Sequence, residues 1–411
     1  MNMSEKIASD TTSGATTLTA CPCCGGRLSK PFYNVGPVPV HSCLMLDTPE
    51  AASAFSQASV TLAQCEDCAF VTNIEFDRKW SAYAPEYEDQ QSFSPTFNSF
   101  AGQLARHLVE AYGLEGKQAV EVGCSKGDFL ALLCEAGNME TVGIDPSVVE
   151  GRVKAPSRGS MRLIQEYYGP QHLDLPADLL CCRHTLEHIQ NVHETLVMMY
   201  AQASKTPGSV LCIEVPCATR LWKDCAFEDI YYEHCSYFTP GSLAAAVRRA
   251  GFGVIDLRRE YDDQYIVIEA VTDPARDTKS PLEDSVEDER AMVEAFVPRV
   301  AATKAAWRDH LTAAKDRGEK IAVWGSGSKC VAFLRTLKVQ HLIDAIVDIN
   351  PHRDGKTAPG LSMPISQPKA LADLKPDTLV IMNPIYEDEI INDCTKMGIK
   401  PKTLKLGQTP E

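Results

Sequence analysis

Four cysteines in two pairs have the spacing most specific for a bound metal in this sequence. Cys21 and Cys24 form one Cys-x-x-Cys pair, and Cys65 and Cys68 form a second pair about forty residues later. Each pair can present two thiolates from one tight turn, and two such pairs complete the tetrahedral four-sulfur site of structural zinc. The spacing therefore predicts a closed zinc site with a structural role. The alternative is four unrelated cysteines that are buried or redox-active.

Acidic, basic and phenolic side chains gather in residues 230–240, which read Ile-Tyr-Tyr-Glu-His-Cys-Ser-Tyr-Phe-Thr-Pro. On an extended segment Tyr231 and Glu233 would point away from His234, so a turn is needed for the three to converge. Histidine titrates near neutral pH, and an adjacent carboxylate can fix its tautomer. The segment therefore predicts a general base, His234, oriented by Glu233. The alternative is aromatic packing around a hydrogen-bonded histidine.

A glycine-containing turn follows the apolar run Gln118–Val122 and precedes a helical pattern. Glu121 stands two residues before Gly123, Gly127 stands four residues after it, and Asp145 ends the next apolar run. In a doubly wound sheet such a turn can bind a cofactor at the helix N-terminus, and the acid can hold two ribose hydroxyls. The G-x-x-x-G spacing differs from the G-x-G-x-x-G of a dinucleotide site. An ordinary strand-to-helix turn is the alternative.

Strand-like and helix-like segments must position these residues. Apolar residues at helical spacing predict a helix over residues 97–112, ended by Gly113. Beyond it, short apolar runs alternate with helical stretches, which predicts a parallel sheet covered by helices on both faces. A long amphipathic pattern follows at residues 289–314, and the alternation begins again near residue 318. The predicted fold class is α/β, with two α/β units.

These patterns divide the chain into five parts. We expect a flexible N-terminus at residues 1–18, a zinc-binding domain at 19–88, a cofactor-binding doubly wound α/β domain at 89–285, a helical connector at 286–317 and a smaller Rossmann-like α/β domain at 318–411. Residues 31–39 contain too many prolines for a helix. The first domain therefore needs more than an apolar core to order it.

Charge and apolar content exclude several classes of function. The 40 Lys and Arg residues and the 55 Asp and Glu residues give a net charge of −15. This charge repels a polyphosphate backbone, so no nucleic-acid partner is expected. No stretch approaches the length of apolar residues that spans a membrane, and residues 1–20 lack the pattern of a signal peptide. We therefore expect no membrane partner and a cytoplasmic protein with reduced thiols.

The glycine turn resembles motif I of class I S-adenosylmethionine-dependent methyltransferases. Residues 178–189, which end in Leu-Glu-His-Ile, resemble the fourth motif of the same enzymes. The resemblance implies that S-adenosylmethionine is the cofactor, with its methionine portion near Glu121 and its ribose on Asp145. The implied cofactor-binding residues are Glu121, Gly123, Gly127, Asp145 and His184. His184 and His188 also have the spacing of a metal pair, but no glutamate stands where a zinc protease needs it, directly after the first histidine.

Nearly the whole chain resembles the three-domain sugar C-methyltransferase family, because the four cysteines, the methyltransferase motifs and the Tyr-x-Glu-His segment follow one another in that order. Residues 86–94, 323–329 and 383–390 extend the resemblance. This family methylates keto-deoxysugar nucleotides and has a zinc-binding domain, a methyltransferase core and a C-terminal domain that helps to hold the substrate. The implied catalytic residues are Tyr87, His188, Tyr231, Glu233 and His234.

The resemblance implies C-methylation, in which a base removes the acidic proton beside a ketone and tyrosines stabilise the enolate oxygen. Two departures lie on the substrate side. Residues 261–265 read Tyr-Asp-Asp-Gln-Tyr where the sugar enzymes commonly have a His-Gly-Gly-Ser turn, and Asp89 stands in place of an aromatic residue of the linker. Methylation of oxygen, nitrogen or carbon in a non-sugar small molecule therefore stays open.

Two rival functions use other parts of the chain. Gly325 and Gly327 with Asp348 could form the nicotinamide site of a reductase, although the third glycine of the fingerprint is missing. The cysteine module could instead bind a partner or a nucleic acid, but the net charge and the lack of basic residues around Cys65 and Cys68 oppose nucleic acid. The expected partner is a small-molecule acceptor, and the chain is expected to be a monomer or a homodimer.

Overall fold

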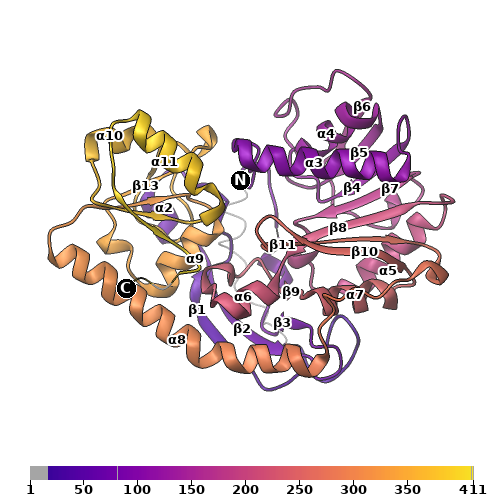
Figure 1. The fold of residues 1–411 in the computed structure, drawn as a ribbon, viewed down its shortest axis with the longest axis horizontal. Helices are drawn as coiled ribbons and strands as arrows, with labels where there is room; N and C mark the ends of the chain where they lie inside the picture. Colours follow the sequence, from indigo (N-terminus) through magenta and orange to yellow (C-terminus); the bar gives the residue numbers. More distant parts are fainter. Residues whose placement is uncertain (1–16, 81, 409, 411) are drawn as a thin grey trace.

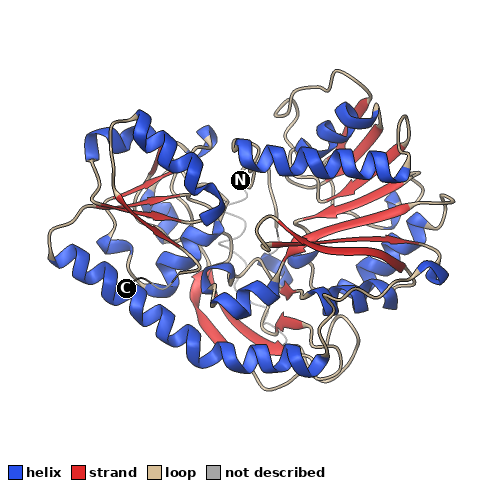
Figure 2. Cartoon of the chain, in the orientation of Figure 1, coloured by secondary structure: helices blue, strands red, loops and turns tan. Residues whose placement is uncertain are grey.

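Three β-sheets and one long helix organise the chain (Figure 1, Figure 2). The structure, a computed structural model, describes residues 17–80, 82–408 and 410. The predicted flexible N-terminus falls almost entirely outside these residues and stays a prediction. The proposed domain boundaries also stay a prediction.

The first sheet is antiparallel and has the strand order β1-β2-β3-β9. It contains β1 (Tyr33–Pro39), β2 (Gln57–Gln64) and β3 (Val71–Asn73), and the short helix α2 (Pro49–Ser53) connects β1 to β2. Its fourth strand, β9 (Ser236–Tyr237), comes from much later in the chain and pairs with Val71 and Thr72 of β3. Because β9 follows residues 231–234 closely in the chain, this pairing holds them next to the N-terminal part of the molecule.

The second sheet has seven strands in the order β10-β11-β8-β7-β4-β5-β6. Its parallel strands are β4 (Gln118–Val122), β5 (Glu140–Ile144), β6 (Ser160–Ile164), β7 (Leu179–Arg183) and β8 (Val210–Pro216). The hairpin of β10 (Gly253–Glu260) and β11 (Tyr265–Val271) is antiparallel and adds to β8. The predicted doubly wound sheet is confirmed, apart from this hairpin. The strand order reverses between β4 and β7, where such sheets bind ligands.

Helices cover both faces of this sheet (Figure 1). On one face lie α3 (Pro95–Tyr112) and α4 (Asp128–Gly137), and on the other lie α5 (Val192–Ala203) and α7 (Pro240–Arg249), each face with its own apolar core. The hydroxyl of Ser94 caps α3 by accepting from the amide of Phe97, and Gly113 ends it in the left-handed conformation, with φ of 62°. The helix predicted over residues 97–112 is therefore confirmed.

The long helix α8 (Val286–Asp316) joins the central part to the C-terminal sheet. Its Phe296 packs on Tyr33 of β1 and on Trp222 of α6 (Ala218–Asp224), with ring centroids 5.6 and 5.1 Å apart. Further along α8, Trp307 packs on Phe333, at 5.1 Å. One continuous apolar core therefore connects the first sheet, α6 and α8 to the C-terminal sheet.

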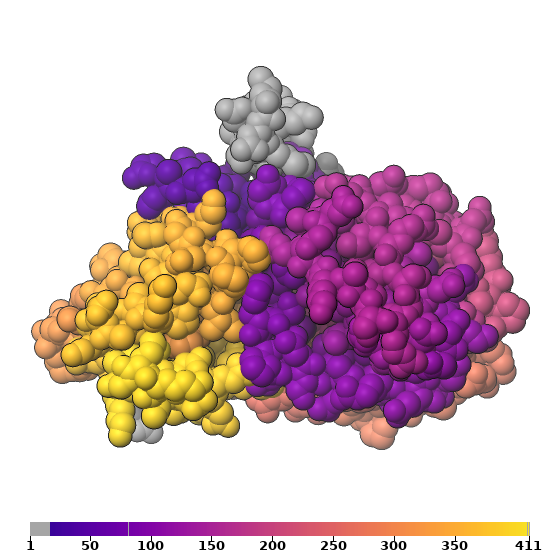
Figure 3. All heavy atoms as spheres, turned by 90° about the horizontal axis from the view of Figure 1, so that it is seen from above, coloured from indigo at the N-terminus to yellow at the C-terminus, as the bar shows by residue number. Residues whose placement is uncertain are grey.

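The third sheet is parallel and has the order β14-β13-β12-β15-β16. Its strands are β12 (Ile321–Trp324), β13 (Ala345–Val347), β14 (Ile365–Ser366), β15 (Thr378–Ile381) and β16 (Lys402–Lys405), with helices α9 (Ser328–Leu337), α10 (Leu371–Leu374) and α11 (Glu387–Lys396). The second α/β unit predicted near residue 318 is therefore present. In Figure 3 its yellow and orange atoms lie directly beside the purple and magenta atoms of the central part.

Single turns of 3-10 helix complete the connections: η1 (Arg78–Trp80), η2 (Pro170–His172), η3 (Leu186–His188), η4 (Phe227–Asp229), η5 (Pro274–Arg276), η6 (Gln340–Leu342), η7 (Pro351–Arg353), η8 (Pro368–Ala370) and η9 (Pro384–Tyr386). None of the helices in the described part of the chain has the length and apolar content to cross a membrane.

Candidate active site

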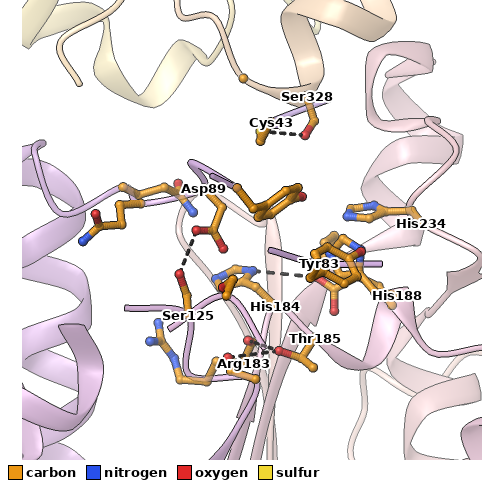
Figure 4. Close-up of a pocket in the computed structure, with 18 of the residues that line it drawn as sticks. Cys43, Tyr83, Asp89, Ser125, Arg183, His184, Thr185, His188, His234 and Ser328 are labelled. Atoms are coloured by element: carbon orange, nitrogen blue, oxygen red, sulfur yellow. Dashed lines mark hydrogen bonds and ion pairs between the residues drawn. The ribbon is translucent and has the colours of Figure 1, made fainter. Parts of the chain in front are cut away.

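A cavity of about 710 Å³ lies where the three sheets meet. The central sheet contributes the carboxyl ends of β4, β5 and β7, at the point where the strand order reverses. The N-terminal and C-terminal parts close the other sides (Figure 4). Most of the candidate site residues line it: Tyr87, Glu121, Gly123, Asp145, His184, His188, Tyr231 and His234. Glu233 and Gly127 lie behind its wall.

A turn brings Tyr231 and His234 together. The amide of His234 donates to the carbonyl of Tyr231 at 3.2 Å, which folds the backbone back on itself. The Tyr231 hydroxyl and His234 Nε2 then share a hydrogen bond of 2.7 Å. Tyr232 points the other way, and its hydroxyl accepts from the amide of Asp77 at 2.8 Å. The turn that the sequence requires is therefore present.

The partners of Glu233 differ from those we expected. Its Oε1 accepts from the Tyr87 hydroxyl at 2.7 Å and from His41 Nδ1 at 3.3 Å. Tyr231, and not Glu233, is hydrogen-bonded to the ring of His234. Adjacent side chains diverge even within the turn, which is the physical reason. In this structure Glu233 therefore positions Tyr87, and the expectation that it orients His234 finds no hydrogen bond to support it.

Burial sets the protonation of the cavity's titratable groups. It lowers the pKa of His234 well below its usual value and lowers the pKa of His188 to about 4. It raises the pKa values of Tyr87 and Tyr231 well above the usual range. Burial also raises the pKa of Glu233, but the adjacent His41 outweighs it and the net pKa is lowered. At neutral pH His188 and His234 are therefore neutral imidazoles, which can accept protons, and Tyr87 and Tyr231 are protonated phenols.

Two residues of this cluster were missed at the sequence level. The Tyr83 hydroxyl lies 2.8 Å from His188 Nδ1, and the His188 and His234 rings are 4.8 Å apart. Tyr83 precedes Tyr87 by four residues in the linker, and this spacing of two tyrosines is a signal that could have found it. His41 is an isolated histidine in a proline-rich segment, and nothing in its sequence context indicates a role.

The glycine turn has the geometry that a cofactor site needs. Gly123 and Gly127 have φ of 74° and 96°, and a Cβ on Gly123 would lie 2.0 Å from Thr185 Oγ1. Asp145 accepts from the amides of Ser125 and Ser147, at 2.9 and 2.6 Å, which fixes its carboxylate at the end of β5. These contacts leave room for further donors, such as ribose hydroxyls.

Glu121 offers an open acceptor in the same wall. It is 3% exposed, and its Oε2 has no hydrogen-bond partner within the described part of the chain. Burial raises its pKa to about 8, even though the nearby Arg183 acts in the opposite direction. A buried carboxylate oxygen without a partner fits the amino group of a bound ligand. The residues present therefore fit S-adenosylmethionine, with Asp145 suited to its ribose hydroxyls and Glu121 to its amino group.

His184 forms part of the cavity wall next to a buried ion pair. Its backbone has φ of 48°, its Nε2 lies 2.6 Å from Glu214 Oε1, and its ring lies 4.5 Å from that of Tyr265. Glu214 also accepts from Arg183, at 3.0 and 3.2 Å. His184 is therefore placed by β8 as well as by its own segment, and it is not arranged with His188 as a metal pair.

The four paired cysteines converge outside the cavity. Their sulfurs all lie within 4.8 Å of one another, with Cys21–Cys68 at 3.8 Å and Cys24–Cys65 at 3.4 Å. Sulfurs bound tetrahedrally at about 2.3 Å from zinc lie about 3.8 Å apart. The amide of Cys23 donates to Cys21 Sγ at 3.4 Å. The donor set and spacing therefore fit zinc, and no described sulfur is in a disulfide.

In the rival nicotinamide site of the C-terminal sheet, the carboxylate of Asp348 is bound by protein groups. Asp348 Oδ2 accepts from the amide and the hydroxyl of Ser326, both at 2.7 Å, and from Arg353 Nη1 at 3.0 Å. The acid that would hold ribose hydroxyls in a reductase is therefore engaged internally.

Comparisons with known proteins agree with this architecture. Residues 97–257 match the model of a methyltransferase domain, and residues 276–400 match that of a C-methyltransferase C-terminal domain. The chain is 27% identical over 319 residues to the C-methyltransferase NovU of Streptomyces niveus. The aligned region covers 72% of this chain and 75% of NovU.

Solved structures give further similarities. The 1,6-didemethyltoxoflavin-N1-methyltransferase of Burkholderia thailandensis is 18% identical, with a TM-score of 0.30, over 41% of this chain and 77% of that one. The magnesium protoporphyrin IX methyltransferase of Synechocystis PCC 6803 is 17% identical, with a TM-score of 0.33. The match covers 43% of this chain and 84% of that one. On the two domain matches and the similarity to NovU, the chain is an S-adenosylmethionine-dependent methyltransferase that is similar to C-methyltransferases.

Proposed function

We propose that this methyltransferase methylates a carbon next to a ketone in a nucleotide-linked keto-deoxysugar, with His234 as the general base. One observation carries the proposal. A single cavity joins the glycine turn and Asp145 to a neutral, buried His234 that is surrounded by protonated tyrosines. An oxygen or nitrogen acceptor already carries the lone pair that attacks the methyl group. A carbon acid must first lose a proton.

The residues of the cavity divide this work between them. His234 accepts the proton from carbon, and the Tyr231 hydroxyl holds the imidazole in place. The hydroxyls of Tyr87 and Tyr83 contact Glu233 and His188 in this structure, and either phenol can stabilise the developing oxyanion by turning its O–H toward it. S-adenosylmethionine, when bound, supplies the electrophilic methyl group.

Glu121, Gly123, Gly127, Asp145 and His184 are the residues that we propose for the cofactor. Replacing Asp145 with alanine is expected to weaken binding of S-adenosylhomocysteine by about 1–3 kcal/mol, because a charge-assisted hydrogen-bond partner is lost. Calorimetric titration measures the change. Asp174→Ala, which alters an exposed acid paired with Lys205, is the matched control and should bind normally. Normal binding by Asp145→Ala would place the ribose elsewhere.

The sugar nucleotide rests on the family resemblance and on the C-terminal wall of the cavity. Ser328 and Lys329, at the N-terminus of α9, line the cavity opposite the glycine turn. A helix N-terminus with a nearby lysine favours a phosphate group. The cavity volume also lies within the range of sites for drug-sized ligands, roughly 300–1,000 Å³.

Product analysis tests the proposal directly. The full chain is incubated with ¹³C-methyl-labelled S-adenosylmethionine and a panel of nucleoside diphosphate keto-deoxysugars, and the product is examined by NMR. A methyl group attached to carbon, adjacent to the former ketone, is the expected result. A methyl group on oxygen or nitrogen, or turnover of non-sugar ketones alone, would contradict it.

The pH dependence follows from the lowered pKa of His234. A histidine with a lowered pKa stays unprotonated, and so stays a base, as the pH falls through 6.5. With both substrates saturating, the rate of methyl transfer should therefore hold its plateau from pH 7.5 to below pH 6.5 and fall only in more acidic solution. Stopped-time assays across this range measure the profile. A half-maximal rate at or above pH 6.5 would show that another group is the base.

We also propose that Cys21, Cys24, Cys65 and Cys68 hold one structural zinc ion. The sulfur spacing supports it, and so does Gly26, where a Cβ would collide with Asp67 at 2.2 Å in the tight turn. Four thiolate ligands leave no open position for a substrate.

A further inference from the structure

Residues 83–91 of the linker lie over the glycine turn of the central sheet. Four polar contacts fasten them: Lys126 Nζ donates to the Pro85 carbonyl at 3.3 Å, Ser125 Oγ to Asp89 Oδ1 at 2.7 Å, Gln90 Nε2 to Asp128 Oδ2 at 2.8 Å, and Arg152 to the carboxylate of Glu88 at 2.6 and 3.0 Å. The N-terminal part of the chain therefore forms one wall of the proposed cofactor site.

Asp89 is the acidic group that this wall presents to the cavity. Its hydrogen-bond partner, Ser125, uses its own amide to bind Asp145, so one serine bridges two carboxylates. Figure 4 shows Asp89 between Ser125 and the contact of Cys43 with Ser328. Of the lysines, arginines and histidines in the described ranges, none forms an ion pair with it. Asp89 is therefore a half-buried carboxylate without a cation of its own.

The position of Asp89 lies between the two halves of the site. Tyr87, two residues earlier, reaches the base cluster through Glu233, and Ser125 belongs to the glycine turn. A methyl group that passes from the cofactor side to the base side must cross this region. Asp89 therefore borders this path, next to the place where the sulfur of a bound cofactor would lie.

We infer that Asp89 distinguishes the methyl donor from its product by charge. S-adenosylmethionine carries a sulfonium cation, and S-adenosylhomocysteine carries a neutral sulfur at the same position. A carboxylate in a cavity of low dielectric constant stabilises a nearby cation far more than it would in water. The amino group, carboxylate and ribose are common to both molecules, so a comparison of the two isolates the sulfonium. The inference rests on the proposed cofactor site and not on the identity of the acceptor.

Burial raises the pKa of Asp89 to about 6, against the opposing effect of Lys126, while Asp145 raises it further. Arg152 and Arg353 are the other charged groups that interact with Asp89. These charged groups are the same whether S-adenosylmethionine or S-adenosylhomocysteine is bound. The preference for the donor should therefore increase as the pH rises through the titration of Asp89.

Calorimetry of the full chain without acceptor tests the inference. Asp89→Asn should weaken binding of S-adenosylmethionine roughly ten-fold and change that of S-adenosylhomocysteine far less, as expected for the loss of one Coulombic contact. Asp89→Glu, which restores the charge, should recover most of the preference. Asp174→Asn removes one surface charge and should change neither affinity. Raising the pH from 5 to 7.5 should increase the preference of the natural protein and leave that of Asp89→Asn flat.

Equal loss of both affinities in Asp89→Asn, or no loss of either, would overturn the inference. Failure of the natural protein to bind both ligands would overturn it together with the cofactor site. A wrong acceptor or a wrong base leaves these titrations unchanged, because neither takes part in them. The outcome is therefore independent of the proposed carbon chemistry.

Discussion

Replacing His234 with alanine is expected to slow methyl transfer about 10²–10⁴-fold, the usual effect of removing a positioned general base. Affinity for S-adenosylhomocysteine should hardly change, because His234 lies on the turn after η4 and not on the glycine turn. His188 lies in the same cavity, with its ring 4.8 Å from that of His234, and shares a hydrogen bond with Tyr83 as His234 does with Tyr231. The defect should therefore appear in the rate and not in binding.

Proton exchange separates this base from other causes of a slow enzyme. The acceptor is incubated in deuterated buffer with S-adenosylhomocysteine in place of the donor, and NMR follows the loss of the α-proton. The natural protein should catalyse exchange, His234→Ala should not, and Tyr231→Phe should retain part of it, since only the hydroxyl that holds the ring is lost. His341→Ala, on an exposed histidine outside this cavity, is the matched control. Normal turnover by His234→Ala would refute the assignment.

Glu233→Gln tests the revised role of that residue. Glu233 accepts from Tyr87 and His41, so the glutamine variant should loosen a phenolic donor and leave His234 as a base. We expect slower methyl transfer with α-proton exchange reduced less than in His234→Ala. Exchange abolished as completely as in His234→Ala would restore the original expectation that Glu233 orients the base.

The double variant Cys65→Ser/Cys68→Ser is expected to lose its zinc and most of the order of the first sheet. Structural zinc contributes about 10–16 kcal/mol in small zinc-binding peptides, and here the ligands flank β2 and β3. Metal analysis should find one zinc per natural chain and none in the variant. Thermal unfolding should begin at a lower temperature, and methyl transfer should fall as well, because β3 pairs with β9 directly after His234.

Cys23→Ser is the matched control for this experiment. Its sulfur is not in the four-sulfur group, and the contact of residue 23 with Cys21 Sγ comes from its amide, which serine keeps. The control should retain its zinc. Full metal retention in Cys65→Ser/Cys68→Ser, or absence of zinc from the natural protein purified without chelator, would refute the site.

The sequence by itself determined the features that depend on local chain geometry. A Cys-x-x-Cys turn, a glycine turn between a strand and a helix, and an acid at the end of the next strand each involve a few consecutive residues with fixed backbone needs. The alternation of strands and helices has periods that can be read directly, so the doubly wound sheet and the helix ending at Gly113 were predicted correctly. In a parallel sheet the strand ends meet at one edge, which brought Glu121 and Asp145 together.

Only the tertiary structure decided which side chains meet across the cavity. His41, Tyr83 and Glu233 come from segments far apart in the chain, and their contacts follow from the pairing of β9 with β3 and from the packing of the linker on the glycine turn. The antiparallel β10–β11 hairpin likewise depends on the open edge of β8. Such contacts depend on the burial and shape of whole surfaces, and a sequence pattern with a short period carries no information about them. For that reason the sequence could indicate His234 as a candidate base, while only the fold placed Glu233 against Tyr87.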